Sequence, residues 1–331
     1  MRCLLMTHGQ AAHLCYRREQ WDKSIGTASV ISLLKRGFNN PWLMISLTCI
    51  FWAGNVVAAR SAIGEISPLL LVSGRWVIAC AILVAIAHQQ LREDWPGLAP
   101  HWLRVFLMGA GGFTVFHALY YLSAHYTTGV NLSIMQGVSP VLVLIGAWLL
   151  WRMRVTWIQA FGCALTIFGI LIVGTHGNMA ELTDLKFNIG DIGMFGASIL
   201  YAVYTLSLRN RPKASPIGFF IVMALAALIA SIPGVIWEWV RGELILPTTS
   251  KGLMILLYTA LFPSLMAQIF YIRSIELIGP NRAILFYNVT PVLSAILATL
   301  FLDEAFELYH AAALAFVVGG VTIAEKLGRP K

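Results

Sequence analysis

Residues 128–151 read TGVNLSIMQGVSPVLVLIGAWLLW, and residues 279–302 read GPNRAILFYNVTPVLSAILATLFL. Each stretch is long and apolar enough to cross a lipid bilayer as a helix, which takes about 20 residues. In both, a proline follows a hydroxyl residue, at Pro140 and Pro291, and Val-Leu comes next. The two stretches indicate a membrane protein with an internal repeat.

The repeat is wider than these two segments. A shift of 151 positions lays residues 116–174 on residues 267–325 without a gap and pairs Tyr120 with Tyr271. Matches of small apolar residues are common in membrane sequences, whereas a tyrosine and an in-helix proline in the same frame are less so. We therefore divide the chain into two related halves.

The composition excludes a water-soluble globule. Of the 331 residues, 58% are hydrophobic and 11% are charged, whereas a soluble domain carries about a quarter of its residues as charges. Apolar segments of spanning length recur near 42–61, 68–88, 102–125, 128–151, 155–174, 190–209, 216–239, 252–275, 281–302 and 307–326. The sequence predicts an all-α polytopic membrane protein with ten transmembrane helices.

Five helices per half is an odd number, so the second half must enter the membrane upside down relative to the first. The charges agree with this inversion. The turn after the fourth helix carries Arg152 and Arg154, whereas the equivalent turn after the ninth carries Asp303, Glu304 and Glu307. We expect two inverted five-helix repeats, with the acidic turn solvated on the outer side.

The basic residues predict the orientation. With both termini cytoplasmic, 18 of the 23 Lys and Arg residues lie on the cytoplasmic side and 4 lie outside, in accord with the positive-inside rule. The net charge of +8 is therefore an orientation signal, and no nucleic-acid partner is expected. In a multi-pass protein of the cytoplasmic membrane we expect a cytoplasmic N-terminal arm at 1–39, a first repeat at 40–174, an external linker at 175–188, a second repeat at 189–326 and a cytoplasmic tail at 327–331.

The stretch Phe51-Trp52-Ala53-Gly54-Asn55 in the first helix, Arg75 in the second, and the proline-centred helix in each half resemble the EamA group of the drug/metabolite transporter superfamily. The resemblance covers residues 40–326. It implies alternating-access movement of small organic metabolites, often outward, through a central cavity between the halves. In that family the proline-centred helix often ends in Gly-Glu, where this chain has Arg152-Met153 and Asp303-Glu304.

Polar and aromatic residues recur at equivalent positions of helices three and eight. His117 and Tyr120 share a helix face, and Gln268 and Tyr271 fall in the same frame. We expect these four side chains to line a common substrate cavity. The alternatives are an interhelical hydrogen bond for His117 and an interfacial aromatic belt for the two tyrosines.

Helices one and six add candidates with an offset of 149, which pairs Trp52 with Tyr201 and Asn55 with Tyr204. Trp52, Asn55 and Tyr204 are suited to stacking on a substrate and hydrogen bonding to it. They are equally compatible with a place in the core or in an aromatic belt.

Arg75 lies about 10 Å along the second helix from its start, at 1.5 Å per residue. A full charge at that depth must reach water, a cavity or a partner. Facing the cavity, Arg75 would suit a carboxylate; snorkelling to the outer headgroups is the alternative. Met223 occupies the matching position of the second half.

The prolines leave backbone carbonyls at Gln136 and Tyr287 without a helical donor. Such groups are tolerated where they line a cavity or meet a polar neighbour. We therefore expect Gln136, Tyr287 and Asn288 to line the cavity, with a packing kink as the alternative.

Several kinds of chemistry have no support in the sequence. No Asp or Glu falls in the middle of a predicted helix, which disfavours a proton-coupled exporter of lipophilic cations. The five cysteines show no metal-ligand spacing, and neither a hydrolase nor a nucleotide motif occurs, so we expect no catalytic residue, metal or cofactor.

The predicted function is a secondary transporter, an exporter of a small neutral or zwitterionic organic metabolite such as an amino acid. Its expected partners are that small molecule and the lipid bilayer. One alternative is uptake of a vitamin or a nucleoside-type metabolite. Another is an integral membrane enzyme or scaffold.

Overall fold

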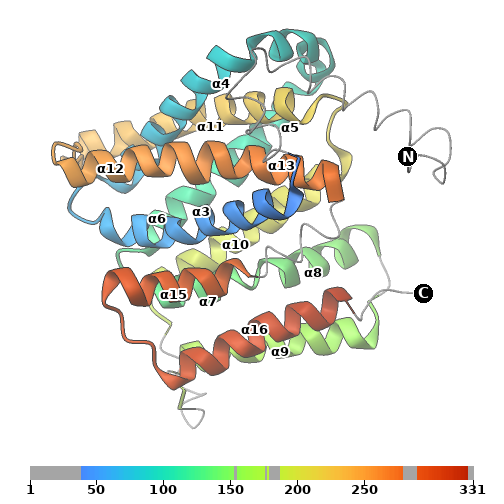
Figure 1. Ribbon diagram of the computed structural model, residues 1–331, viewed down its shortest axis with the longest axis vertical. Helices are drawn as coiled ribbons and strands as arrows, with labels where there is room; N and C mark the ends of the chain where they lie inside the picture. The colour runs from blue at the N-terminus through green and yellow to red at the C-terminus, as the bar shows by residue number, and fades with distance from the viewer. Residues whose placement is uncertain (1–38, 153–154, 176, 179–186, 279–288, 327–331) are drawn as a thin grey trace.

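The computed structural model describes residues 39–152, 155–175, 177–178, 187–278 and 289–326, and every regular element within them is a helix (Figure 1). Six helical segments in these ranges are long and apolar enough to cross a membrane, and three shorter apolar helices accompany them. The chain is therefore an all-helical membrane protein. The expected beginning of the ninth helix, at 281–288, nearly all of the expected arm, most of the expected linker and the expected tail lie outside the described residues.

The helices follow the predicted segments closely. The first half contains α3 Pro41–Ser61, α4 Pro68–Leu98, η1 Ala99–His101, α5 Trp102–Gly109, η2 Ala110–Val115, α6 Phe116–Ser123, α7 Gly129–Gln136, α8 Ser139–Trp151 and α9 Trp157–Gly174. The second contains α10 Ile189–Ser207, η4 Leu208–Asn210, α11 Pro216–Val240, α12 Ser250–Thr259, η5 Ala260–Met266, α13 Ala267–Ile278, α15 Thr290–Leu302 and α16 Leu308–Lys326. We call the end of the molecule where α3 begins and α16 ends the terminus end, and the opposite end the far end.

α4 and α11 cap one another across the two halves. The Glu238 carboxylate, near the end of α11, accepts hydrogen bonds from Leu69 N (2.8 Å) and Leu70 N (3.0 Å) at the start of α4. Asp94, near the end of α4, accepts one from Ser215 N (3.1 Å) at the start of α11. Both carboxylates satisfy donors that a first helical turn leaves unpaired. The two helices are thus antiparallel and tied at both ends.

α4 is longer than the apolar segment from which it was predicted. The polar run after residue 88 ends the segment, but the helix continues to Leu98, with a kink at Ala87 and Pro96 inside it. Residues 89–94 have high helix propensity, and Asp94 accepts a hydrogen bond from the start of α11. These two factors, rather than burial of apolar side chains, stabilise the extension.

The third and eighth helices each contain a π-helical stretch, η2 and η5, at the same repeat position. The shift of 151 lays Phe113 of η2 on Ser264 of η5 and Gly112 on Pro263. A π-helical turn inserts a residue into the α-helical ladder and is frequent at functional sites. Both stretches contribute to the site described below.

The predicted helix 128–151 is interrupted near its middle. α7 ends at Gln136, and Gly137 N and Val138 N donate to Ile134 O (3.0 Å) and Met135 O (3.2 Å) in a tighter turn. α8 then begins at Ser139, which places Pro140 in a first turn, where no helical donor is needed. The expected single helix is therefore broken into α7 and α8.

α8 and α15 end in the same unusual way. Arg152 (φ 48°) and Asp303 (φ 52°) are the non-glycine residues with positive φ among those described, and they are equivalent in the repeat. These are the positions at which the family resemblance leads one to expect glycine, which adopts this left-handed conformation without strain. The backbone therefore keeps the glycine geometry although the side chains differ.

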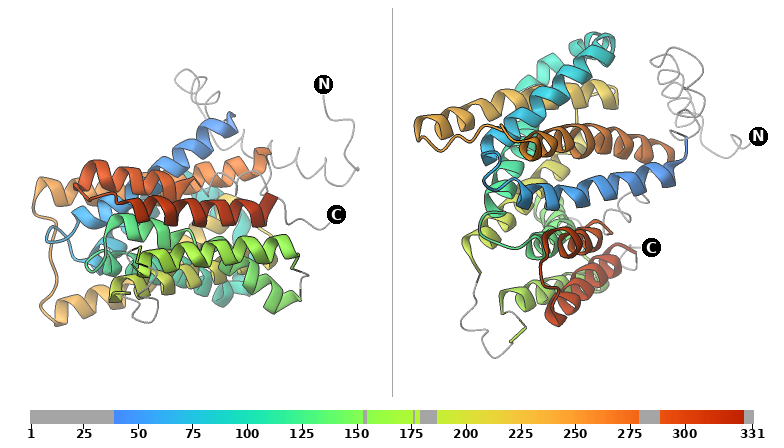
Figure 2. Two further views of the ribbon diagram at one scale, coloured as in Figure 1. Left: turned by 90° about the horizontal axis from the view of Figure 1, so that it is seen from below. Right: turned by 60° about the vertical axis from the view of Figure 1, so that its left-hand side comes forward.

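α9 and α16 pack side by side at one edge of the molecule (Figure 2). The approach is close because a Cβ added at Gly320 would lie 2.4 Å from the Gly162 carbonyl oxygen, and one added at Gly162 would lie 2.4 Å from Gly320 O. Among the described cysteines, Cys49 and Cys80 are buried and Cys163 is half-buried.

Candidate functional site

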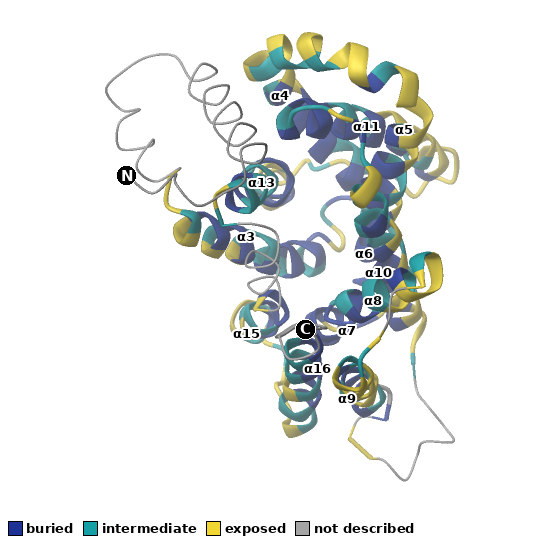
Figure 3. Ribbon diagram, turned by 90° about the vertical axis from the view of Figure 1, so that its right-hand side faces the viewer, coloured by how far each residue is buried: buried dark blue, intermediate teal, exposed yellow. Residues whose placement is uncertain are grey.

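A cavity of about 340 Å³ lies between helices of the two halves. Residues at the ends of α10 and α13 and at the start of α11 border it, so it reaches the terminus end, which faces the viewer in Figure 3. The first half contributes Phe113 of η2 together with parts of α8 and α9, and the second half contributes α10, α11, α13 and α16.

The cavity wall is mostly apolar, with six aromatic rings and a few polar groups among aliphatic side chains. Its rings belong to Phe113, Tyr201, Tyr204, Phe219, Phe220 and Tyr271. Gln159, Gln268, Ser139 and Thr205 add amides and hydroxyls, and Arg211 is the basic residue among the described lining residues, which include no Asp or Glu. Such a wall can stack on a ring and hydrogen-bond neutral groups, but offers no negative charge to a cation.

The far end is closed by a network around Arg60 and Glu304. Arg60 Nε lies 3.3 Å from Glu304 Oε1, and its Nη1 donates to Ala124 O at 2.5 Å. The Glu304 carboxylate also accepts from Gly129 N (2.8 Å) and Val130 N (3.0 Å) at the start of α7. The network joins the ends of α3, α6 and α15 to the beginning of α7.

The prediction of a solvated acidic turn is wrong for Glu304, whose side chain is only 10% exposed. The left-handed residue Asp303 ends α15, and the next side chain meets the unpaired amides of the first turn of α7. A helix N-terminus favours a negative charge, so the carboxylate lies inside the protein rather than in water.

A second link at the far end joins Glu65 to the segment before α12. The Thr249 hydroxyl donates to the Glu65 carboxylate, and Lys251 Nζ lies 3.5 Å from Glu65 Oε1. The hydrogen bond from Thr249, supported by the Lys251 charge, lowers the pKa of the Glu65 carboxyl. This link therefore depends on an ionised Glu65.

Arg75 is fully buried in a polar cluster between the cavity and the far end. Its Nε donates to Ser264 Oγ at 2.5 Å, its Nη1 donates to the Tyr121 hydroxyl, and Tyr121 donates in turn to Asn55 Oδ1 at 2.9 Å. Its remaining nitrogen, Nη2, is buried without a hydrogen-bond partner, as is the neighbouring Trp76 Nε1. α3, α4, α6 and η5 thus all contribute to the cluster.

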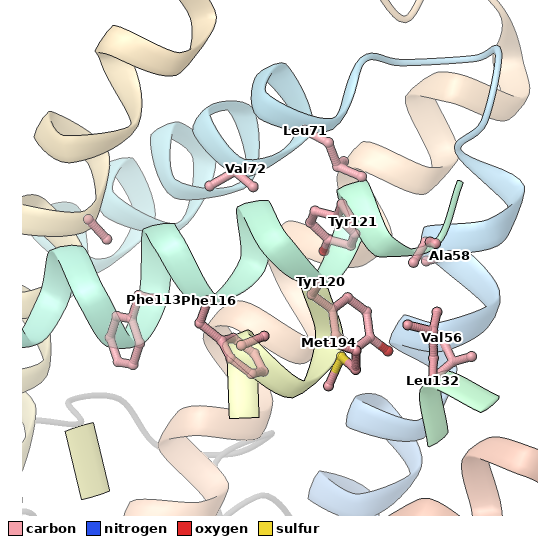
Figure 4. Packing of buried hydrophobic residues seen from close by; sticks show 14 of the residues in the cluster. Val56, Ala58, Leu71, Val72, Phe113, Phe116, Tyr120, Tyr121, Leu132 and Met194 are labelled. Carbon is pink, nitrogen blue, oxygen red and sulfur yellow. The ribbon is translucent and has the colours of Figure 1, made fainter. Parts of the chain in front are cut away.

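Aromatic rings separate this cluster from the cavity. Trp76 stacks on Phe113 with ring centres 5.0 Å apart, and Phe113 borders the cavity beside Tyr204 at 5.5 Å. Figure 4 shows Tyr121 on α6, with Phe113 further along the same row of helical turns. The rings of Trp76 and Phe113 therefore lie between the Arg75 guanidinium and the cavity.

The Arg75 cluster and the cavity wall occupy equivalent positions of the two halves. First-half residues that do not border the cavity correspond to second-half residues that do, as follows: Asn55 to Tyr204, Arg75 to Met223, His117 to Gln268 and Tyr120 to Tyr271. Asn55, Arg75 and Tyr120 are at most 7% exposed. At these four positions the second-half residues border the cavity, whereas their first-half equivalents do not.

Three of the predicted site residues, Tyr204, Gln268 and Tyr271, line the cavity. Trp52 lies beside this group, since its ring centre is 5.2 Å from that of Tyr271 and its Nε1 donates to Pro263 O at 3.2 Å.

Four others lie toward the far end. Asn55 and Arg75 belong to the polar cluster, and His117 lies beside it, with its Nδ1 2.5 Å from Phe113 O and its ring 6.0 Å from that of Tyr121. Tyr120 is buried near Val56 and Met194 (Figure 4). The snorkelling alternative for Arg75 is wrong, because its side chain reaches neither water nor the surface.

The remaining candidates belong to the helix breaks. Gln136 is half-buried at the break between α7 and α8, and its Oε1 is buried without a partner. Tyr287 and Asn288 lie outside the described residues.

The sequence interpretation missed Ser264, Phe113 and Trp76, which complete the Arg75 cluster and its aromatic cover. Their repeat equivalents differ in character, as with Phe113 and Ser264, so the repeat gave no signal for them. Phe219 and Arg211 of the cavity lie close to Ser215-Pro216, and the position of that helix start could have indicated them.

Residues 40–175 and 188–324 each match the family described as the EamA-like transporter family. The chain belongs to this family. The two matches make it a multi-pass membrane transporter with two EamA halves, and set aside the alternatives of a membrane enzyme or a scaffold.

Relatives of this chain include two similar proteins of Bacillus subtilis (strain 168). The uncharacterised transporter YyaM is 22% identical over 272 residues, 78% of this chain and 85% of its own length. The uncharacterised transporter YetK is 24% identical over 273 residues, 82% of each chain. Both support the family assignment along most of the chain.

A more distant relative has a named substrate. The S-adenosylmethionine/S-adenosylhomocysteine transporter of Chlamydia trachomatis serovar L2 is 20% identical over 195 residues, 57% of this chain and 58% of its own length. A solved crystal structure matches 87% of this chain and 96% of its own with a TM-score of 0.60 and 20% sequence identity, which shows a shared fold.

Proposed function

We propose that this transporter exports a small neutral or zwitterionic metabolite, such as an amino acid, by alternating access through the cavity between its halves. In this proposal the chain crosses the membrane ten times as two inverted five-helix repeats, with both termini in the cytoplasm. The units are the arm 1–39, the repeats 40–174 and 189–326, the linker 175–188 and the tail 327–331.

The observation that carries this proposal is the wall of the 340 Å³ cavity, in which rings, amides and hydroxyls line the space and no acidic residue is found among the described lining residues. A small solute with an apolar or aromatic body and few polar groups suits such a wall. A lipophilic cation would lose its hydration shell without gaining a counter-charge. Neutral and zwitterionic solutes therefore suit this wall better than cations do.

The difference between the two halves supports alternating access. Four second-half positions border the cavity and their first-half equivalents do not, so exchanging the two packing arrangements would close the terminus end and open the far end. Inverted repeats permit this exchange because the halves are related by an axis in the membrane plane. We also propose that Trp52, Gln136, Tyr287 and Asn288 bind the substrate, on the basis of their positions in the repeat.

The distribution of Lys and Arg residues supports a terminus end on the cytoplasmic side, and this orientation supports export. A terminus end in the cytoplasm presents the open cavity to cytoplasmic metabolites, which fits loading for export. A reporter enzyme active only in the cytoplasm should be active when fused after Lys331 and inactive when inserted at Asp303–Glu307. Activity at both sites would refute ten crossings.

A second candidate substrate is an adenosyl metabolite. It is favoured by the distant relative named for S-adenosylmethionine and S-adenosylhomocysteine. Such a compound combines an aromatic base with an amino-acid end, which suits stacking beside Tyr204 and Tyr271.

The test is a metabolite profile, inside and outside, of cells lacking the protein and of cells overproducing it. We expect at least one small metabolite to accumulate outside overproducing cells and inside cells that lack the protein. Tyr204→Ala should abolish the difference, whereas Trp157→Ala, which removes a 91% exposed ring at the start of α9, should preserve it. No difference in any metabolite would contradict transport.

A further inference from the structure

We infer that Arg75, with Trp76 beside it, forms an anion-binding subsite on the closed part of the pathway, so that the transported solute carries a carboxylate. This inference rests on the proposed transport function and adds a substrate class to it. It also assigns a second substrate position, distinct from the open cavity.

The first argument is the lack of charge compensation. Arg75 is 0% exposed, and no Asp or Glu in the described part of the chain forms an ion pair with it. Its partners are the neutral hydroxyls of Ser264 and Tyr121 and the faces of two aromatic rings. Burial of an unpaired ion is strongly unfavourable, and a bound anion would remove much of that cost.

The second argument is the pair of unused donors. Arg75 Nη2 and Trp76 Nε1 are both buried without a hydrogen-bond partner, and the guanidinium carbon lies 5.8 Å from the centre of the Trp76 ring. Buried donors are nearly always paired in proteins. A purely structural arginine would have its donors satisfied by protein groups, whereas a binding residue keeps one available for its ligand.

The third argument is the location. Arg75 is the repeat equivalent of Met223, which lines the open cavity, and Asn55 and His117 are equivalents of the cavity residues Tyr204 and Gln268. When the two packing arrangements exchange, the Arg75 cluster takes the place of the cavity wall. Phe113 borders the present cavity, and its ring stacks on that of Trp76, which lies beside Arg75.

The small number of free donors favours a carboxylate over a phosphate. A carboxylate has two oxygens, which a guanidinium nitrogen and an indole N–H can both serve. A phosphate would bring more oxygens and a larger charge into a site without further free donors among the described residues. The aromatic cover and cavity wall favour an apolar or aromatic body attached to that carboxylate.

The experiment compares two probes that differ in charge and share one ring. Purified full-length protein in lipid nanodiscs is titrated with 3-phenylpropionate and with its neutral isostere 3-phenylpropionamide. We expect the wild type to bind the carboxylate at least tenfold more tightly than the amide. Arg75→Met should bind both equally, and Arg75→Lys should show an intermediate preference.

The matched control is Arg241→Met, which removes an exposed cation that borders neither the cavity nor the Arg75 cluster. It should keep the wild-type preference, which separates a specific subsite from general attraction of anions. Amide binding by Arg75→Met serves as its check of folding. If that variant does not fold, Arg75→Lys decides, because its ammonium lacks the planar fork of donors, and its preference must fall at least threefold.

Equal affinity of the wild type for both probes, binding of neither, or a preference that survives in the Arg75 variants would overturn the inference. A metabolite difference in the cell experiment together with any of these results would leave the transport function standing. The two proposals can therefore fail separately.

Discussion

Replacing Glu304 by glutamine should open the far end of the transporter. In the arrangement described here, the carboxylate receives two backbone amides of α7 and faces Arg60, which is 29% exposed, so one side chain joins three helices. Glutamine keeps the size and one acceptor oxygen but loses the charge. The variant should therefore weaken the closure without disturbing the packing.

The cost can be estimated from these contacts. Loss of a negative charge at a helix N-terminus costs about 0.3–1 kcal/mol, and a hydrogen bond to a charged group is worth about 1 kcal/mol more than a neutral one. The ion pair with the partly exposed Arg60 adds little to this free-energy cost because water screens it. A total of about 1–2 kcal/mol, at 1.4 kcal/mol per factor of ten, raises the far-open population about 5- to 30-fold.

The assay is cysteine labelling by a membrane-impermeant thiol reagent in a variant without native cysteines. Val56→Cys reports on the closed pathway, since Val56 is 0% exposed and is the repeat equivalent of the cavity residue Thr205. Glu304→Gln should raise its labelling rate from the far side by the factor given above. Thr205→Cys should become less reactive in the same variant, because opening one end closes the other.

Glu238→Gln is the matched control. It also removes a capping carboxylate at the far end, but Glu238 ties α11 to α4 outside the Arg60 network. It should lower thermal stability and leave the labelling of Val56→Cys unchanged. An unchanged rate in Glu304→Gln, or an equal rise in both variants, would refute the assignment of Glu304 to the closure.

Three further predictions concern stability, measured by thermal unfolding of the purified protein. Gly320→Ala should cost about 1–3 kcal/mol because its Cβ would meet the Gly162 carbonyl oxygen, whereas Gly319→Ala, with nothing within 4 Å, should not destabilise the protein; equal effects would contradict the close α9–α16 packing. Arg152→Gly and Asp303→Gly should each stabilise by about 0.5–1 kcal/mol by relieving a left-handed backbone, and Arg152→Ala should give no such gain. Because the pKa of Glu65 is lowered in the folded protein, the stabilisation from its link to Thr249 is complete above the unfolded pKa of about 4.3 and is lost as the pH falls through the folded pKa. The wild type and Glu65→Gln should therefore converge in stability at low pH. A constant difference between them would contradict the link.

The helices could be predicted because lipid imposes a length and a polarity on every crossing. The repeat also provided an equivalent segment in the other half with which each predicted helix could be compared. The same repeat gave Tyr204, Gln268 and Tyr271 of the cavity. The end of α4 could not be predicted in this way, since residues after 88 are polar and only Asp94's contact with α11 holds the extension in place. Tertiary contacts, not composition, determine that boundary.

The partners of Arg75 were also beyond the sequence. Its depth in the helix follows from residue spacing, but spacing leaves snorkelling and burial equally open. Burial results from a π-helical turn that places Ser264 at Nε and from Tyr121 on α6. No local pattern predicts a π-helical turn, and Ser264 has a phenylalanine as its repeat equivalent.

The two halves differ most where their equivalents meet the pathway, and this has a consequence for selectivity. During transport by the proposed alternating access, each half adopts the packing arrangement of the other. Each half nevertheless keeps its own side chains. The cavity open at the terminus end is bordered by Met223 and Tyr204, whereas a cavity open at the far end would be bordered by Arg75 and Asn55. The solute would then meet a mostly apolar wall, with Arg211 after the end of α10, on one side of the membrane, and the buried charge of Arg75 beside the amide of Asn55 on the other. Affinity for a carboxylate should therefore be higher from the far side, and the Arg75→Met variant should make the two sides more alike.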